Sequence, residues 1–253
     1  TVLISLLLFD YNYYVNLIII TSLPLVIIGA IDDSIKLGVS IRLITQLFFS
    51  LLIIGSGLKI TSLGIYDFFP QIDLGMFSIV LTVIAVMGLT NALNFIDGID
   101  GLCASLCIIA FISLGIIFYI EGYTFFYNII IVYIACLTSF LFFNLKILKL
   151  PKLFLGDSGS MFLGFSISWF LIYFGNNSPQ DFHPVLVLWV ITLPIFDLIS
   201  VFIRRIVRGI NPFKPDRRHI HYLMLDRGVS PSISLIFLIF ISLFNNFTGI
   251  FIY

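Results

Sequence analysis

Four polar side chains stand three residues apart in the stretch NALNFIDGIDGL, directly after one of the most apolar runs of the chain. They are Asn91, Asn94, Asp97 and Asp100, and a continued helix would stack them on one stripe. An ionisable group near hydrocarbon depth costs roughly 2.5–3.5 kcal/mol on insertion scales, so such groups are candidates for function. The structural alternative is a polar turn that merely ends a helix.

A second pair of acids, Asp32 and Asp33, ends the apolar run that begins at Val15. Carboxylates at a helix C-terminus oppose the helix dipole by about 0.3–1 kcal/mol each, so a structural role there is poorly motivated. Lys36 or Arg42 could simply neutralise them. The functional alternative is a pair that binds a cation or takes up a proton at the membrane surface.

The segment FLGDSGS places Asp157 where the N-cap of the following helix is expected. Capping alone would account for this residue. The functional alternative is a helix N-terminus that presents N–H groups to a phosphate while Asp157 holds a metal on that phosphate. Mg²⁺ takes one or two carboxylates and completes its octahedron with water and substrate phosphates.

The segment from Arg204 to Leu225 contains six basic residues, together with His219 and His221. A basic loop can be only a topology signal that attracts anionic lipid headgroups, but this does not explain the histidines. Two histidines among arginines suit an anionic ligand such as a diphosphate. In the run before this loop, Asp197 could serve catalysis or pair with a basic residue.

The chain as a whole is 60% hydrophobic and 10% charged, far less charged than a soluble domain at about 25%. Long apolar runs without strand alternation predict an all-α, polytopic transmembrane bundle. We expect about eight full spans plus a partial span at Val2–Phe9. The predicted full spans are Val15–Ile31, Leu43–Ile54, Met76–Leu93, Leu102–Ile120, Phe125–Phe143, Met161–Phe174, Pro184–Ile203 and Ile233–Tyr253.

No linker is long enough for a second domain, so residues 1–253 are expected to form a single transmembrane domain. Because Thr1 begins on what resembles half a helix, we expect the domain to be truncated at its N-terminus, and a further span after Tyr253 stays open. Alternating spans place 12 of the 13 basic residues on one side. The positive-inside rule makes that side cytoplasmic. It also receives the acids described above.

Carboxylates for a divalent metal and basic groups for phosphate oxygens are what phosphoryl transfer requires, since its catalysis is mostly positioning and charge stabilisation. The donor would be cytoplasmic and the acceptor lipid-borne. An alternative of another class is a cation-coupled transporter, which would carry ionisable groups near the middle of the bilayer and broken helices in corresponding halves. Here the acids gather at one end and no repeat is evident.

The order AIDDS, NALNFIDGIDGL, FLGDSGS, PIFD and PDRRHIHY resembles the polyprenyl-phosphate N-acetylhexosamine-1-phosphate transferase family, the MraY/WecA superfamily, over essentially the whole chain. The loop PFKPDRRHIHYL is more similar to the WecA-like branch. This resemblance implies a phosphotransferase that uses UDP-GlcNAc and undecaprenyl phosphate to form undecaprenyl-diphosphate-GlcNAc and UMP, initiating cell-surface polysaccharide synthesis. An MraY-type phospho-MurNAc-pentapeptide transferase is the nearest alternative.

The resemblance also implies roles for the acids. Asp32 and Asp33 match the catalytic pair near the lipid phosphate, whereas Asp97 and Asp100, with Asn94, match residues that line the nucleotide-sugar site.

Of the remaining positions, Asp157 matches the metal ligand, and Mg²⁺ is the implied cofactor, with Mn²⁺ as a substitute. Asn144 and Phe154 match positions near the uridine. His219 and His221, with Arg218 beside them, match a motif that contacts the diphosphate.

Two departures from the family pattern affect these implications. Tyr222 stands where the motif HIHH ends in histidine, and an upstream substrate-binding loop is absent, so activity of this chain alone is open. The implied location is the bacterial inner membrane, with the active site on the cytoplasmic face. Membrane lipids are expected partners, nucleic acid is not, and a homodimer stays open.

Overall fold

The computed structural model describes residues 12–64, 72–147, 151–177, 187–211 and 218–252. Within these residues the chain is helical and forms no β-strand, apart from one isolated bridge between Ser62 and Asp73. The predicted all-α class is therefore confirmed. The helices are α2 (Tyr13–Ile35), α3 (Val39–Gly55), α4 (Phe77–Ile96), α5 (Leu102–Ile120), α6 (Thr124–Asn144), α7 (Gly156–Asn177), α8 (Val187–Val190), α9 (Thr192–Val207), α10 (Ile220–Asp226) and α11 (Pro231–Ile252).

Six helices in the described part of the chain are long and apolar enough to cross a membrane, namely α2, α4, α5, α6, α7 and α11. The predicted count of eight full spans is not confirmed. Helix α3 is apolar but shorter, and the predicted partial span Val2–Phe9 lies outside the described residues.

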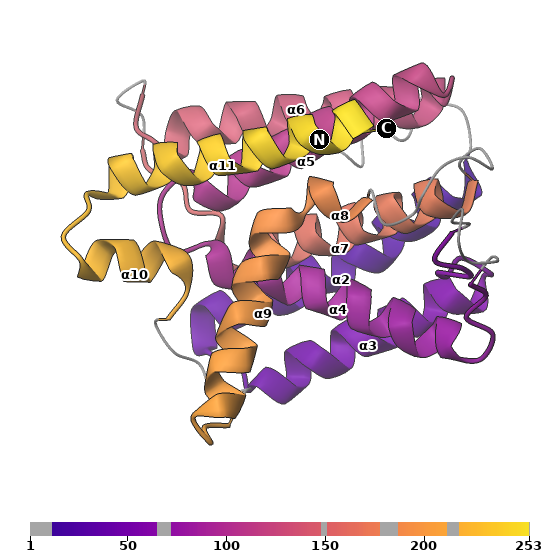
Figure 1. Ribbon diagram of the computed structural model, residues 1–253, viewed down its shortest axis with the longest axis horizontal. Helices are drawn as coiled ribbons and strands as arrows, with labels where there is room; N and C mark the ends of the chain where they lie inside the picture. Colours follow the sequence, from indigo (N-terminus) through magenta and orange to yellow (C-terminus); the bar gives the residue numbers. More distant parts are fainter. Residues whose placement is uncertain (1–11, 65–71, 148–150, 178–186, 212–217, 253) are drawn as a thin grey trace.

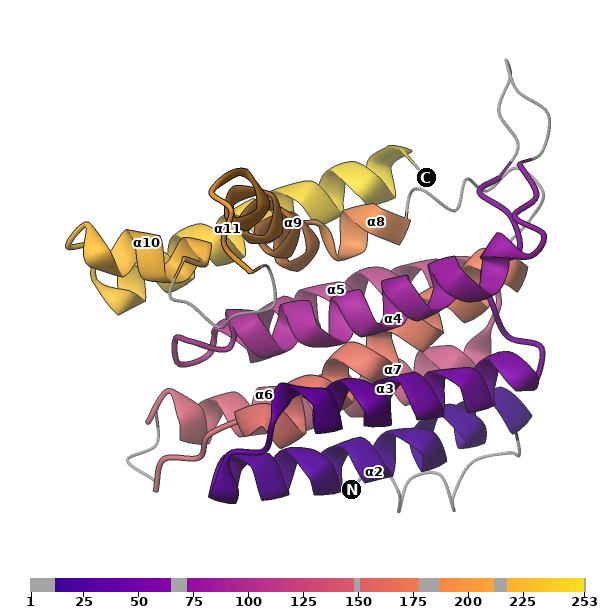
Figure 2. The ribbon, with the colours of Figure 1, turned by 90° about the horizontal axis from the view of Figure 1, so that it is seen from below.

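The apolar run from Pro184 to Ile203, predicted as one span, is not one helix. In its described portion α8 ends at Val190 and α9 begins at Thr192, with Ile191 between them outside helical geometry. Pro194 explains the break, because proline lacks an N–H and its ring clashes with the carbonyl four residues earlier. Helix α9 consequently runs across the direction of the other helices (Figures 1 and 2).

The interior is built around α5 and α7, which are largely buried, whereas α6 and α11 expose most of their surface. Helix α7 packs against α2 and α4, and α5 packs against α6 and α11 (Figure 1). Large aromatic side chains fill the space between α5, α6 and α7, including Phe111, Tyr133 and Phe170. The packing of α7 between α2 and α4 determines where the first turn of α7 lies.

The connections α2–α3, α4–α5 and α6–α7 all lie at one end of the bundle, on the left in Figure 2. Short helix α10, which the sequence pattern did not predict, lies at this end too. We call this end of the bundle the acidic end, because it carries Asp32, Asp97 and Asp157. The antiparallel order of the helices therefore brings together segments that are far apart in the sequence.

Candidate active site

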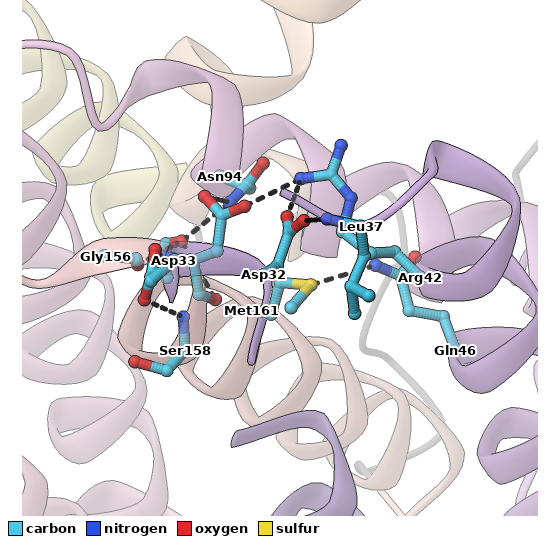
Figure 3. A network of polar contacts seen from close by, with 11 residues as sticks. Asp32, Asp33, Leu37, Arg42, Gln46, Asn94, Gly156, Ser158 and Met161 are labelled. Carbon is cyan, nitrogen blue, oxygen red and sulfur yellow. Dashed lines mark hydrogen bonds and ion pairs between the residues drawn. The ribbon is translucent and has the colours of Figure 1, made fainter. Parts of the chain in front are cut away.

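Asp157 lies in the first turn of α7 and contacts two other helices. Its Oδ1 accepts a hydrogen bond from Asn94 Nδ2 on α4 at 2.8 Å, and its Oδ2 lies 2.7 Å from Arg42 Nη1 on α3. Asn94 Nδ2 is also 3.0 Å from Ser160 Oγ, one turn further along α7. The network around these side chains is drawn in Figure 3. The two oxygens of this carboxylate are thus both engaged.

Asp33 caps the N-terminus of α7 from a different helix. Its Oδ1 accepts from the backbone N–H of Asp157 at 2.9 Å and its Oδ2 from that of Ser158 at 3.4 Å (Figure 3). Gly156 permits this approach, since its φ is +66° and a Cβ there would lie 2.4 Å from Asp33 Oδ2. The alternative that Asp157 is itself the N-cap is wrong: Asp157 lies inside α7, whose N–H groups Asp33 satisfies.

Asp32, one residue earlier on α2, is nearly buried. Its Oδ2 lies 2.9 Å from Arg42 Nη1, and its Oδ1 accepts from the backbone N–H of Leu37. Of the two cations considered as neutralising partners, Arg42 therefore makes the contact. Because Arg42 also contacts Asp157, the acids of α2 and α7 share one guanidinium (Figure 3). The neutralisation of Asp32 by Arg42 therefore does not exclude a functional role for this carboxylate.

The predicted stripe through Asn91, Asn94, Asp97 and Asp100 does not continue as one helix. Helix α4 ends at Ile96, so Asp97 is its C-cap and Asp100 lies in the following turn. The two Asp-Gly pairs end the helix, as the polar-turn alternative held. Asp100 nevertheless has a partner across the chain, because Lys152 Nζ lies 2.6 Å from its Oδ2.

Asp97 differs from Asp32, Asp33 and Asp157 because no described residue forms a hydrogen bond with its carboxylate. Burial raises the pKa of its carboxyl to about 7, and the nearby charges of Asp157, Asp100 and Asp33 act in the same direction. Asp97 thus lies within electrostatic reach of Asp33, Asp100 and Asp157. A carboxyl with a pKa near neutrality can exchange a proton at physiological pH.

The connection between α6 and α7 carries the two residues that the resemblance assigns to the uridine. Asn144 Nδ2 donates to the carbonyl of Leu153 at 2.7 Å, whereas its buried Oδ1 has no partner among the described residues. Phe154 is 71% exposed, and Lys152 Nζ lies 4.5 Å from its ring centroid. Lys152 therefore links this connection to Asp100 in the α4–α5 turn.

His219 is held by Asp197, which lies on α9 after the helix break at Ile191. His219 Nδ1 lies 2.7 Å from Asp197 Oδ2, and Asp197 Oδ1 accepts from the backbone N–H of Ile220 at 2.8 Å. Both side chains are buried. The alternative that Asp197 pairs with a basic residue is therefore confirmed in an unexpected form, with a histidine as the partner.

His221 is fully buried, and neither ring nitrogen has a hydrogen-bond partner among the described residues. Burial, followed by the influence of His219, lowers its pKa to about 4. The ring lies against Gly98, where a Cβ would come within 2.1 Å of His221 Nε2, so only glycine fits. Since His219 also lies 5.3 Å from the Phe95 ring, both histidines reach the end of α4.

Arg218 precedes this pair, and its carbonyl accepts from Arg204 Nη2 on α9 at 3.1 Å. We call Arg218–His221 the histidine segment. The structure joins this segment to α9 and to the end of α4.

Sequence reasoning considered Arg42 only as a neutralising charge and missed Gln46 altogether. Gln46 is buried, accepts from Asn91 Nδ2 at 2.7 Å and approaches Met161 Sδ at 3.5 Å. A signal was present: Arg42, Gln46 and Ser50 recur every four residues within an apolar helix. That spacing places three polar side chains on one face, which turns into the bundle. Arg42 and Gln46 meet partners there, whereas Ser50 Oγ has none among the described residues.

Among the described residues, no group of three or more His, Cys, Asp or Glu side chains is arranged to hold a metal ion. Mg²⁺ does not require such a group, because one or two carboxylates with water and substrate phosphates suffice. Asp32 and Asp157 meet this lesser requirement, and the positively charged guanidinium of Arg42 already lies against both carboxylates. The residues present therefore fit a cation that binds together with a phosphorylated substrate.

Comparison with known proteins extends over most of the chain. A family model described as glycosyl transferase family 4 matches residues 15–175. The undecaprenyl-phosphate alpha-N-acetylglucosaminyl 1-phosphate transferase of Escherichia coli (strain K12) is 36% identical over 206 residues, which are 81% of this chain and 56% of that protein.

The protein of the same name from Salmonella typhi is 34% identical over 223 residues, 86% of this chain and 60% of its own length. A probable undecaprenyl-phosphate N-acetylglucosaminyl 1-phosphate transferase of Bacillus subtilis (strain 168) is 32% identical over 212 residues, 84% of this chain and 58% of that protein. The chain thus spans somewhat more than half the length of these relatives.

Proposed function

The chain belongs to glycosyl transferase family 4, and on this premise we propose that the protein transfers GlcNAc-1-phosphate from UDP-GlcNAc to undecaprenyl phosphate. The relatives carry the name of this reaction. The observation that carries the proposal is the meeting of acids from α2 and α7 with the C-terminal end of α4, against which the histidine segment packs. Phosphoryl transfer depends on such groups for positioning and charge stabilisation.

In the proposed reaction, an oxygen of the acceptor phosphate attacks the phosphorus that bears the sugar. A new P–O–P bridge forms while the bond from that phosphorus to the UMP oxygen breaks, and UMP leaves with the electron pair. Negative charge therefore grows on the departing UMP. His219 and Arg218 belong to the segment that would lie beside this charge, and Asp197 holds His219 Nδ1 so that only Nε2 remains for a ligand.

Mg²⁺, or Mn²⁺ in its place, would be held by Asp157, with Asp32 as the nearest second carboxylate. When bound, such an ion neutralises phosphate charge and orients the diphosphate. Asn94 would keep Asp157 Oδ1 oriented. Asp33, whose two oxygens both accept backbone N–H groups, would act by holding the first turn of α7 beside the acceptor phosphate.

Asp97 is our candidate for a general base. Its pKa of about 7 lies close to the second pKa of a phosphate monoester, about 6. A base with this pKa can remove the remaining proton from the acceptor phosphate, so that the attacking oxygen is fully ionised. The absence of hydrogen bonds to Asp97 among the described residues leaves both its oxygens available.

For the donor, we assign the nucleotide-sugar side of the site to the α4–α5 turn and the α6–α7 connection. Asp100, bound to Lys152, and Asn94 would line the sugar-diphosphate region. Phe154 presents an exposed aromatic face on which a uracil ring can stack, and Asn144 lies at the base of the same connection.

We place this end of the bundle in the cytoplasm and the protein in the bacterial inner membrane. The acidic end carries the basic residues Lys36, Arg42, Lys152 and Arg218, and the positive-inside rule assigns a basic end to the cytoplasm. A soluble nucleotide sugar would then enter from the cytoplasm, whereas the prenyl phosphate would enter from the lipid.

The test is a reconstitution that measures UMP release from UDP-GlcNAc by the purified protein in lipid nanodiscs. We expect release only when undecaprenyl phosphate and Mg²⁺ are both present, together with formation of undecaprenyl-diphosphate-GlcNAc detected by mass spectrometry. UMP release that continues without the prenyl phosphate would indicate hydrolysis and would contradict the proposed transfer.

A donor panel then distinguishes the branches of the family. UDP-GlcNAc, UDP-GalNAc and UDP-MurNAc-pentapeptide are offered separately with the same acceptor. We expect the highest kcat/KM with UDP-GlcNAc. A preference for the pentapeptide donor would instead assign the protein to the MraY-type reaction.

A further inference from the structure

A single nitrogen of Arg42 contacts carboxylates from two different helices. Its Nη1 lies 2.9 Å from Asp32 Oδ2 and 2.7 Å from Asp157 Oδ2 (Figure 3). Arg42 itself belongs to α3, so the contact joins three helices at one point. An arginine remains charged at every physiological pH, which makes it a permanent counter-ion for this pair of acids.

The surroundings of Arg42 make this counter-ion necessary. The side chain of Asp32 is 6% exposed and that of Arg42 is 15% exposed, so water screens their charges weakly. Two carboxylates that approach each other in such a place repel unless a cation lies between them.

Packing fixes the helix face that carries Arg42, but the guanidinium does not use all of its hydrogen-bond donors among the described residues. One turn further along α3, Gln46 contacts Met161 on α7 (Figure 3). Gln46 also accepts from Asn91 on α4, so this face of α3 is fixed against both helices. Arg42 Nε, however, is buried without a hydrogen-bond partner among the described residues. Because a buried unpaired donor costs free energy, the present position of the guanidinium is not the most favourable one that it could have. Moving away from Asp157 would therefore not break a complete set of hydrogen bonds.

The contact also competes with metal binding. Asn94 donates to Asp157 Oδ1, and Arg42 occupies Oδ2. A neutral amide can share its carboxylate with a divalent cation, but a guanidinium 2.7 Å from the same oxygen would be repelled by that cation.

We propose that Arg42 is a positioning residue that serves as an internal counter-ion: it holds Asp32 and Asp157 together in the metal-free protein and releases Asp157 when a divalent cation binds. The inference rests on the proposed function, in which Asp157 is the metal ligand. Its specific consequence is that removing the guanidinium charge strengthens cation binding while it weakens the metal-free protein.

The experiment compares Arg42→Gln with the unaltered protein in nanodiscs, after removal of metal. Free Mn²⁺ is followed by electron paramagnetic resonance during titration, without substrate, and the unfolding temperature is measured in EDTA and in Mg²⁺. We expect Arg42→Gln to bind Mn²⁺ about fivefold more tightly, which is about 1 kcal/mol. We also expect a lower unfolding temperature in EDTA and a larger rise on adding Mg²⁺.

Three variants serve as controls. Arg208→Gln removes a positive charge from the exposed end of α9 and should leave Mn²⁺ affinity unchanged. Arg42→Lys keeps the charge in a smaller head group and should bind Mn²⁺ with an intermediate affinity, which also provides a reading if Arg42→Gln does not fold. Asp157→Asn should abolish the tight Mn²⁺ site.

The outcomes separate the two proposals. Equal or weaker Mn²⁺ binding in Arg42→Gln, with the site still lost in Asp157→Asn, overturns the counter-ion role and leaves the metal assignment standing. Mn²⁺ binding that persists unchanged in Asp157→Asn overturns the metal assignment and the counter-ion role together.

Discussion

The acidic cluster and the histidine segment lie at the same end of the bundle but are held in opposite ways. In the cluster of Asp32, Asp33 and Asp157, every carboxylate oxygen has a hydrogen-bonding or ionic partner, drawn from the α2–α3 connection, α3, α4 and α7. In the histidine segment one acid, Asp197, holds both His219 and the start of α10, and neither ring nitrogen of buried His221 has a partner in the described residues.

This difference indicates how each region is organised for its task. The cluster is positioned by the packing of long helices, and the guanidinium of Arg42 offsets part of its negative charge before any ligand binds. The histidine segment is attached through Asp197 and contains a buried ring, that of His221, whose nitrogens have no hydrogen-bond partner among the described residues. The two regions should therefore respond differently to the loss of one side chain, and to acid and alkali.

The largest effect is expected from the cluster. Asp157→Asn keeps the shape of the side chain and its contact with Asn94 but removes the charge that would bind the metal. We expect UMP release to fall by about 100-fold or more, with the helical circular dichroism unchanged. The matched control is Asp226→Asn, an exposed acid at the same end, which should retain its rate. Equal losses in both variants would show a nonspecific charge effect.

A smaller loss is expected in the histidine segment. Asp197→Ala removes the partner of His219 Nδ1 and of the Ile220 N–H at once. Loss of a residue that orients a ligand-binding histidine typically costs about 10–100-fold, and we expect kcat/KM to fall in that range. Limited proteolysis should also cleave the α9–α10 connection faster. An unchanged rate with faster cleavage would reduce Asp197 to a purely structural role.

The two regions should have opposite sensitivity to pH. The pKa of His221 is lowered to about 4, from an ordinary value of 6.5, so it stabilises the protein above pH 6.5. This stability is lost as the pH falls from 6.5 toward 4, because the unfolded chain then binds a proton that the native ring does not. His221→Leu should flatten the decline in unfolding temperature over that range. An identical decline in both proteins would exclude His221 as its source.

Asp97 provides the alkaline counterpart. Its pKa is raised to about 7, from an ordinary 3.8, so its contribution to stability is present below pH 4 and is lost as the pH rises toward 7. Asp97→Asn, which does not titrate, should unfold at a higher temperature than the unaltered protein above pH 7. The gain should be about 1–2 kcal/mol, since solvent screens a partly exposed carboxyl. The difference should vanish near pH 4.

Several features of the fold and site followed from residue types alone. Long apolar runs without alternation required helices, because a backbone in lipid must satisfy its own hydrogen bonds. The order of the five motifs identified the family, which the match to residues 15–175 confirms. Clustering of acids beside a basic histidine segment was also predicted, and the contacts of Asp157 with Asn94 and of His221 with Gly98 agree with it.

Other predictions failed because they extended a local pattern beyond its range. The stripe from Asn91 to Asp100 assumed that α4 continues past Ile96, but the Asp-Gly turn ends it. The span from Pro184 to Ile203 ignored the break that Pro194 imposes. The capping role given to Asp157 belongs to Asp33, which lies 124 positions away and could not be identified from neighbouring residues.

The sequence by itself determined that this chain is a bundle of apolar helices with acids and histidines at one end, because hydropathy and charge act on each segment separately. Only the tertiary structure decided which acid caps α7, which two share Arg42, and which histidine is held by Asp197. Those partnerships depend on how α2, α3, α4, α7 and α9 pack. The complementary shapes of many side chains together set the distances between these helices, and no single segment of the sequence contains that information.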